Sequence, residues 1–596
     1  MKKSCFMLSL LMIAQLALAV PAKKEWRTVT QSDGTTITVM LCGDETFHYY
    51  KTTDDVPLVL TSSGDYCYAN TMGFSLTSTG VIAHEDSLRS PNERLQVSSA
   101  DNLPAMRMNA ARSSTERQQD IANRISKTKS MSDGKERHGL VIMVSFTDRD
   151  FRNASAYKDW NAILNEDGYS DNGANGSVHN YFYDQSQGMF NLKFDCVGPI
   201  QMPKASTYYG KNSGRTVDIN AGEMVATACT AADAYVNFKD YDWDGDGYVD
   251  QVYILYAGYG EHYSGNSANL LWPHEYQLSA FSAYRDLTID GVKINTYACG
   301  SELAGWERDG KTDLSGIGTF CHEFSHCLGI PDFYVTDDYA DGLDMLGDWD
   351  LMSSGAYNNS GWCPPNYTSY EKELSGWITP TVLTEPTTVT DMESISQNGD
   401  VYKVINDCDD NNVDEYYLLE NRQKIGWDKY IPGQGLMVLH VDYNKARWEN
   451  NTVNNYRETP GVGYIPANGR SNTPERWGYP YGTTGNSLTD TSSPKAAVHH
   501  TNKQGTKLMG KPITNIAASD EYTASFDFCK GSTSGINDIQ TVTDENALYG
   551  QPATIYDVQG RKIATTQSYN GVNGMAQGMY IVRGYNGQTL KIMNSK

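Results

Sequence analysis

The chain has 596 residues, enough for roughly three or four domains with separate cores. Its formal charge of −24 and isoelectric point near 4.8 argue against nucleic acid or an anionic membrane surface as the natural partner. The composition instead fits an extracellular protein that binds cations.

Residues 1–19 have the features of a secretory signal peptide. Lys2 and Lys3 precede an apolar run that continues through Leu18, and Ala17-Leu18-Ala19 provides a small-residue cleavage site. No later run reaches the roughly 18 apolar residues of a membrane span. We therefore expect an exported chain without a transmembrane segment, which is soluble or attached to a surface by other means.

Two segments of different character make up residues 20–137. Residues 23–100 contain short alternating runs such as Thr35–Leu41, separated by Asp-Gly, Gly-Asp and Ser-Gly turns, which predicts a small β-rich module. Residues 101–137 are polar and lack apolar periodicity. They are interpreted as a surface linker or a weakly amphipathic helix, and as the place for proteolytic activation.

The next domain is expected to begin at residue 138. Gly139–Phe146 is a continuous apolar run of strand length and predicts a buried strand. Residues 177–183 indicate a helix, and 190–194 a following strand.

An acidic loop follows at residues 242–250. Its carboxylates and glycine occupy positions 1, 3, 5, 6 and 9 of a calcium loop, and a main-chain carbonyl would supply position 7. The expected calcium ligands are Asp242, Asp244, Asp246, Tyr248 through its carbonyl, and Asp250. Position 12 is Tyr253 instead of glutamate, so we predict a structural calcium site and not an EF-hand sensor. The alternative is a solvated acidic turn.

The chemistry of the chain is concentrated in residues 316–334, which contain His-Glu-x-x-His. Residues four apart lie on one face of a helix, so His322 and His326 can direct their imidazoles at one ion, and such a pair suits zinc. Glu323 would reach a water on the metal and take its proton as general base. By chance the same pattern arises on amphipathic helices whose histidines are only solvated.

A catalytic zinc usually has three protein ligands, and the end of this helix indicates the third. Gly329 can close the helix in the left-handed conformation and Pro331 prevents its continuation, so the chain turns sharply and Asp332 returns beneath the metal. We favour Asp332 over a neighbouring cysteine as the third ligand.

The chain resembles the metzincin-like, secreted immune inhibitor A-type metalloproteases in two features. One is the pattern His322-Glu-x-x-His-x-x-Gly-x-x-Asp332, and the other is the sequence Gly-Ile-Pro-Asp at its end. Trp349–Gly355 is similar to the methionine turn of metzincins, with Met352 beneath the zinc. The resemblance implies a metzincin-like catalytic domain at 138–380. It also implies that residues 20–137 are a prodomain and linker.

Further residues are assigned more loosely. Tyr357 is a candidate for the tyrosine with which some metzincins stabilise the oxyanion, although its offset from the methionine differs from the usual one. His274 is either a substrate-side donor or a structural residue. A second calcium site could use Glu302, Asp341, Asp344 and Asp348, which are otherwise solvated carboxylates. His440 is a poor alternative zinc ligand, because it lies far from the motif and lacks a partner at i+4.

The cysteines leave two hypotheses about latency. Cys42 could occupy the open zinc position and block the site, or it could pair with Cys67, which is the pairing we favour. Cys321 and Cys327 lie six apart on the predicted helix, about 9 Å along its axis, and cannot bridge each other. If they are oxidised, Cys299 and Cys363 are the nearest partners in sequence.

Two β-rich regions complete the chain. Residues 381–530 contain strand-like runs at 401–405, 416–420 and 435–442, which suggests a β-sandwich. Residues 536–596 alternate as short antiparallel strands and resemble the C-terminal sorting domain of type IX secretion, which carries proteins across the outer membrane. The alternative for this segment is a carbohydrate- or protein-binding module.

Taken together, the sequence predicts an α+β multidomain protein. The resemblance implies a secreted zinc endopeptidase, found extracellularly or on the outer-membrane surface, with a structural calcium. Its partners would be protein or peptide substrates and the secretion machinery. The alternatives are a non-catalytic adhesin with a protease-like fold and a zinc hydrolase acting on another substrate class.

Overall fold

A computed structural model describes residues 19–594 except for sixteen short gaps, at 72–75, 99–101, 104–105, 107–114, 214–216, 264–265, 268, 337–343, 411, 471–477, 483–484, 520, 531–547, 558–560, 573 and 585–588. All of the predicted signal peptide except Ala19 lies outside the described residues. The chain divides into two compact units, one reaching to Thr384 and including Val389–Phe526, the other combining Glu385–Thr388 with Asp527–Lys596. Within the described residues, no helix combines the length and apolar character needed to cross a membrane.

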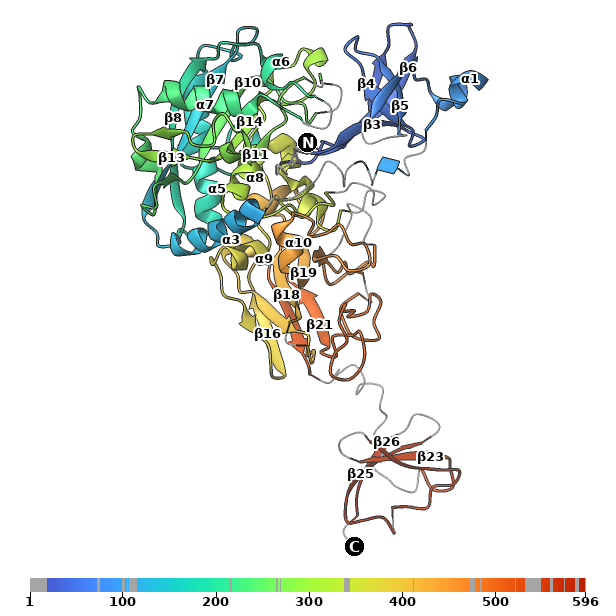
Figure 1. Cartoon of the computed structure of the whole chain (residues 1–596). Helices are drawn as coiled ribbons and strands as arrows, with labels where there is room; N and C mark the ends of the chain where they lie inside the picture. The colour runs from blue at the N-terminus through green and yellow to red at the C-terminus, as the bar shows by residue number, and fades with distance from the viewer. Residues whose placement is uncertain are drawn as a thin grey trace, which may run out of the picture. The chain divides into compact units, whose positions relative to one another are not determined.

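A mixed sheet forms the centre of the first unit (Figure 1). Its strands lie in the order β11-β14-β10-β7-β8, and only the edge strand β11 runs antiparallel to its neighbour. The bounds are β7 Glu136–Ser145, β8 Asn191–Gln201, β10 Val252–Tyr259, β11 His274–Gln277 and β14 Thr296–Leu303. A smaller sheet holds β9 Tyr248–Val249, β12 Thr288–Ile289 and β13 Val292–Ile294.

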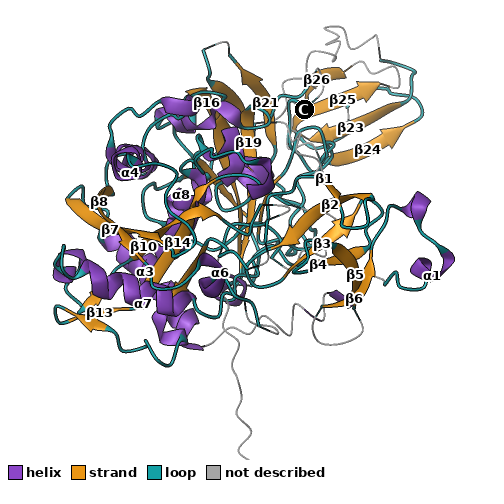
Figure 2. Cartoon of the chain, turned by 90° about the horizontal axis from the view of Figure 1, so that it is seen from above, coloured by secondary structure: helices purple, strands orange, loops and turns teal. Residues whose placement is uncertain are grey.

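Helices cover both faces of the central sheet (Figure 2). They are α4 Ala156–Asn165, α5 Val178–Gln185, α6 Ser206–Tyr209, α7 Ala221–Ala232 and α8 Gly318–Cys327, whereas α9 Ser369–Leu374 packs against β18 Asp414–Arg422 of another sheet. Val141 and Met143 of β7 belong to the core that contains α4, α5 and α8, whereas Leu140 and Ile142 belong to the core that contains α7. Burial on both faces explains the continuous apolar run, and the predicted strand at 139–146 is confirmed.

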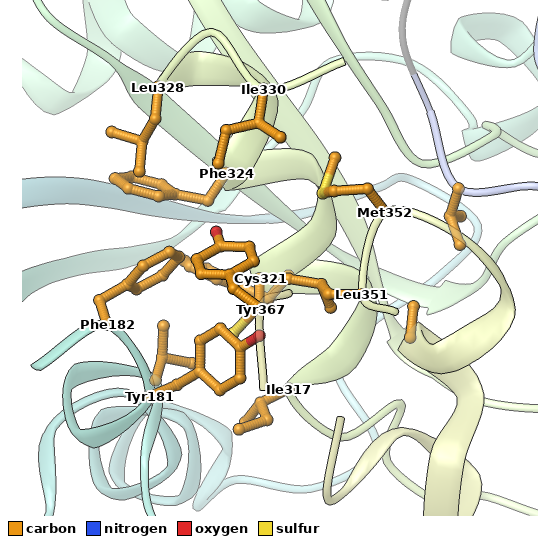
Figure 3. Packing of buried hydrophobic residues seen from close by; sticks show 14 of the residues in the cluster. Tyr181, Phe182, Ile317, Cys321, Phe324, Leu328, Ile330, Leu351, Met352 and Tyr367 are labelled. Carbon is orange, nitrogen blue, oxygen red and sulfur yellow. The ribbon is translucent and has the colours of Figure 1, made fainter. Parts of the chain in front are cut away.

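Helix α8 is buried along its whole length. Phe320 stacks on Tyr253 of β10 with ring centroids 3.8 Å apart, and Phe324 packs against Phe182 and Phe194. Figure 3 shows Cys321 and Phe324 of this helix among Tyr181, Phe182 and Tyr367. Aromatic packing therefore fixes the helix that carries the His-Glu-x-x-His pattern.

The region preceding this domain is β-rich, as expected, and forms a six-stranded antiparallel sheet in sequence order with its own core. Its strands are β1 Arg27–Thr30, β2 Thr36–Gly43, β3 His48–Thr52, β4 Pro57–Leu60, β5 Tyr66–Asn70 and β6 Thr77–Ile82, and α1 Pro91–Arg94 follows. Cys42 on β2 and Cys67 on β5 have two strands between them, and the structure has no disulfide between them. The favoured Cys42–Cys67 pairing is therefore wrong.

The polar segment 101–137 contains a helix, α3 Thr115–Ser130. Ile121, Arg124 and Thr128 of this helix are buried. Arg124 donates to the main-chain oxygen of His326, and Thr128 donates to that of Leu328. Two of these three buried side chains are polar, so the pattern of apolar residues in the sequence does not predict that α3 packs against the core.

Residues beyond 380 form two further sheets. One has the order β15-β17-β18-β19-β20, with β15 Thr381–Val382, β17 Tyr402–Ile405, β18 Asp414–Arg422, β19 Gly435–Tyr443 and β20 Val462–Tyr464. The other has the order β16-β22-β21, with β16 Thr387–Met392, β21 Ile513–Ala518 and β22 Ala524–Phe528, and α10 spans Lys445–Glu449. The strands predicted at 401–405, 416–420 and 435–442 are confirmed.

The second unit contains a four-stranded antiparallel sheet in the order β24-β23-β25-β26. Its strands are β23 Ala553–Asp557, β24 Lys562–Thr566, β25 Gly578–Gly584 and β26 Thr589–Asn594. It has a small core of its own.

Candidate metal centre

Helix α8 and the turn after it bring the predicted zinc ligands together. The Nε2 atoms of His322 and His326 are 3.2 Å apart, and Oδ1 of Asp332 is 3.1 Å from the first and 3.3 Å from the second. All three side chains are fully buried. Ligands of a tetrahedral zinc at about 2.05 Å lie about 3.4 Å from one another, so this spacing fits the ion.

The outer nitrogens of the two histidines are held by main-chain carbonyls. Nδ1 of His326 is 2.7 Å from the oxygen of Ile330, and Nδ1 of His322 is 2.8 Å from the oxygen of Leu351. An N–H at Nδ1 leaves Nε2 with its lone pair directed at the metal position. The carbonyl of Leu351 belongs to the segment interpreted as the methionine turn.

Asp332 is oriented by Asn451, which lies 119 residues later in the sequence. Asn451, just after α10, donates from Nδ2 to Oδ2 of Asp332 at 2.6 Å and accepts the Asp332 N–H at 2.8 Å. Oδ1 of Asp332 is buried and receives no hydrogen bond from the described residues. Burial alone would raise the pKa of Asp332, but His326 and His322 hold it well below its usual range. An ionised oxygen left without a donor beside two imidazoles fits a metal ligand.

Glu323 lies beside this group on α8 and is also fully buried. Its Oε1 accepts the N–H of Val20 at 2.7 Å, whereas Oε2 has no hydrogen-bond partner among the described residues. Burial raises the pKa of the Glu323 carboxyl well above its ordinary value. A carboxyl in this setting can accept a proton and pass it on.

Residues 19–22 of the same chain contact the site through their main-chain atoms. Three side chains donate to three successive carbonyls of this segment. They are Tyr334 to Ala19 at 2.8 Å, Trp272 to Val20 at 3.0 Å, and Tyr357 to Pro21 at 2.6 Å. The contacts are made to main-chain atoms, so the site can hold a peptide largely independently of its side chains.

Two further predicted residues lie close to this site. Tyr357, in the turn Ser354–Gly361, makes the carbonyl contact described above. Met352 is fully buried in the core that also contains Phe324 and Ile330 (Figure 3), and its carbonyl accepts the N–H of Phe333. Cys42 is not among the groups of metal-ligating side chains found in the described residues.

The end of α8 has the predicted geometry. Gly329 has φ +93°, the left-handed conformation, and a Cβ there would lie 2.8 Å from Cγ1 of Ile125 on α3. This close approach lets α3 pack across the end of the helix.

The predicted calcium loop is compact. Asp242, Asp244 and Asp250 offer ligand atoms that all lie within 4.8 Å of one another. Nζ of Lys127 on α3 lies 3.1 Å from Asp244, 2.8 Å from Asp246 and 3.1 Å from Asp250. Burial raises the pKa of Asp250 to about 6, although Lys127 opposes the shift. The sequence did not indicate a lysine at the predicted cation position.

The remaining predicted residues have protein partners. His274 bonds to the carbonyl of Trp272 and the hydroxyl of Tyr297, which favours the structural interpretation. Glu302 accepts the main-chain N–H groups of Arg152 and Gly258. Asp344 accepts from Ser353 and Ser354. Asp341 lies outside the described residues, and no metal-ligating group in the described chain includes Glu302, Asp344 or Asp348.

Comparison with known proteins agrees with this chemistry. Residues 127–377 match the family described as immune inhibitor A peptidase M6, catalytic domain. The pre-pro-metalloprotease PrtV of Vibrio cholerae is 28% identical over 245 residues, covering 37% of this chain and 26% of that protein. Immune inhibitor A of Bacillus thuringiensis is 24% identical over 217 residues, covering 33% and 31%.

A third relative, named as a secreted metallopeptidase of Arthroderma benhamiae, is 27% identical over 208 residues, covering 31% of this chain and 30% of its own length. The aligned part therefore spans about a quarter to a third of each relative. Residues 127–377 are similar to a peptidase M6 catalytic domain, and these similarities support a metalloprotease, whose chemistry implies a bound metal.

Proposed function

We propose that the chain is a secreted zinc endopeptidase that hydrolyses peptide bonds of extracellular proteins. The observation that carries the proposal is the buried triad of His322, His326 and Asp332, with its ligand atoms 3.1–3.3 Å apart and Glu323 beside it at a peptide N–H. A zinc ion held by these three residues would act as a Lewis acid and lower the pKa of a coordinated water.

The protein's own groups divide the remaining work. Glu323 takes the proton of the attacking water and returns it to the leaving amine. Tyr357 donates to a main-chain carbonyl and is positioned to stabilise negative charge on the carbonyl oxygen during attack. Trp272 and Tyr334 hold the neighbouring carbonyls, which keeps the peptide extended across the site.

The same geometry makes the precursor latent. Val20–Ala22, which remain after removal of residues 1–19, fill the place of a substrate, so activity requires this segment and the β-rich module of residues 23–100 to leave. We place the activating cleavage within the linker 101–137, which includes residues outside the described ranges. Residues 1–19 would direct export, and the second unit, with its four-stranded sheet, would be the type IX sorting domain that engages the secretion machinery.

The test is cleavage of casein by the activated, prodomain-free chain, with and without a zinc chelator. Glu323→Gln should lower turnover by at least about a hundredfold, because general-base catalysis contributes on this scale, while zinc content stays unchanged. Glu307→Gln is the matched control, since this carboxylate pairs with Arg149 outside the metal centre. Equal cleavage by Glu323→Gln would overturn the mechanism. A zinc-loaded wild type without cleavage would favour the adhesin or another substrate class.

A further inference from the structure

A second group of histidines and carboxylates lies on the sheet beyond residue 380. Glu415 of β18 is directly opposite Asp442 of β19, and Tyr417 is opposite His440. Side chains two apart on a strand share a face, so Glu415, His440 and Asp442 project to the same side. His499 and His500, from the segment between β20 and β21, contact this face. We call these five residues the His440 cluster.

The contacts in the His440 cluster alternate between imidazole and carboxylate. Nε2 of His440 is 2.8 Å from Oε1 of Glu415, and Nδ1 of His499 lies 3.0 Å from Oδ2 of Asp442 and 4.0 Å from Oε1 of Glu415. The half-exposed His500 places Nε2 3.1 Å from Oδ1 of Asp442. One ligand atom each from Glu415, His440 and His499 fits within 4.8 Å, the limit that the zinc triad also meets.

The charges of the cluster call for a cation. Glu415 and Asp442 are both buried and face each other across antiparallel strands, an arrangement in which like charges destabilise a sheet. Glu415 also accepts from the main-chain N–H groups of His499 and His500, so the 499–500 segment is folded around this carboxylate. The amide of Asn406 also donates to Glu415, at 2.7 Å, and these hydrogen bonds stabilise the carboxylate but leave its negative charge in place opposite that of Asp442.

We infer that the His440 cluster is a second transition-metal site, with Glu415, His440 and His499 as ligands to zinc or a similar divalent ion. Asp442 holds His499 from the other side or serves as a fourth ligand. Mixed imidazole and carboxylate donors suit zinc better than calcium. The distances of 2.8 and 4.0 Å are less even than those of the catalytic triad, so the site is expected to bind more weakly.

The bound ion would cross-link segments that are distant in the sequence. It would join β18 and β19 to residues 496–500, which follow β19 after more than fifty residues. Its role is structural and independent of catalysis, so the inference stands whether or not the proposed peptidase activity is found.

The test measures zinc in the full chain after stripping with chelator, reloading and removal of free metal. Wild type should retain two equivalents and His440→Gln one, because glutamine keeps a donor for Glu415 but is a poor zinc ligand. His138→Gln is the control and should retain two, since His138 has Asp195 and Glu136 near it but belongs to no metal-ligating group among the described residues. His326→Gln should lose the catalytic equivalent only.

A second measurement separates folding from metal binding. Zinc should raise the unfolding temperature of His326→Gln, and the rise should disappear in His326→Gln combined with His440→Gln. If His440→Gln fails to fold, Asp442→Asn decides, with a zinc affinity expected to fall about tenfold or more. Equal zinc content in wild type and a folded His440→Gln, an unchanged affinity of Asp442→Asn, or a persisting temperature rise in the double variant would overturn the inference and leave a metal-free hydrogen-bonded network.

Discussion

Asn451 offers a sharp test of how the metal centre is built. It makes two hydrogen bonds to Asp332, one to the carboxylate at 2.6 Å and one from the main-chain N–H at 2.8 Å. Asn451 has φ +53°, a left-handed conformation that asparagine tolerates and alanine does not. Asn451→Gly therefore removes the two bonds without adding backbone strain.

The expected effect is a loss of zinc affinity by about ten- to a hundredfold, or roughly 1.4–2.7 kcal/mol, the usual cost of losing a partner of a metal ligand. The Asp332 carboxylate could still reach the metal position, but the Asn451 amide would no longer hold it in one orientation. The Asp332 N–H would also be left buried without its acceptor, which costs about 1–3 kcal/mol of folding stability.

The assay is competition for zinc between the protein and a chromophoric chelator, with thermal unfolding measured in parallel. Asn450→Ala is the matched control, because its amide bonds to Ala446 within the α10 segment. A zinc affinity of Asn451→Gly within twofold of wild type, in a folded protein, would refute the argument that Asn451 orients Asp332.

Two other predictions concern the prodomain and the acidic loop. His48 on β3 pairs with Glu261 at 3.0 Å; burial would lower its pKa, but Glu261 raises it to about 8. Since this folded-state value lies above that of a free histidine, docking of the module should be strongest below about pH 6.5 and weaken as pH rises through 8. Release of the β-rich module of residues 23–100 by a protease should therefore increase as the pH rises through 8. His48→Phe should abolish this pH dependence. Lys127→Met should raise calcium affinity, measured by calcium-dependent unfolding temperature, because it removes the ammonium at the acidic loop. Asp250→Asn should lower the calcium affinity. If calcium leaves the unfolding temperature of Lys127→Met unchanged, the predicted site is contradicted.

Local signals in the sequence were sufficient for the parts of the site that are close in the chain. The spacing of His322 and His326, the glycine that ends their helix and the return of Asp332 all depend on one turn of backbone, and the structure brings these residues together. The buried strand at 139–146 was recognisable because helices cover both of its faces, which produces an uninterrupted apolar run.

Contacts made by polar residues over long distances left no such signal. Arg124 and Lys127 lie in a polar segment. Arg124 nevertheless bonds to the end of α8, and Lys127 pairs with the acidic loop 242–250. The pairing of Cys42 with Cys67 seemed favourable by count, but strand order separates them. His499 is more than fifty residues from Asp442, the nearest cluster residue on the strands.

The supports of the three proposed zinc ligands indicate that the candidate metal centre depends on more of the chain than the motif. His326 is held by Ile330 within the same turn, His322 by Leu351 about thirty residues later, and Asp332 by Asn451, beyond the boundary predicted at 380. Arg422 on β18 strengthens this link, because its guanidinium donates to the carbonyl of Trp349 in the methionine-turn segment. The sheet beyond residue 380 therefore contributes directly to the geometry of the metal centre, and only a chain that includes it contains the complete set of supports.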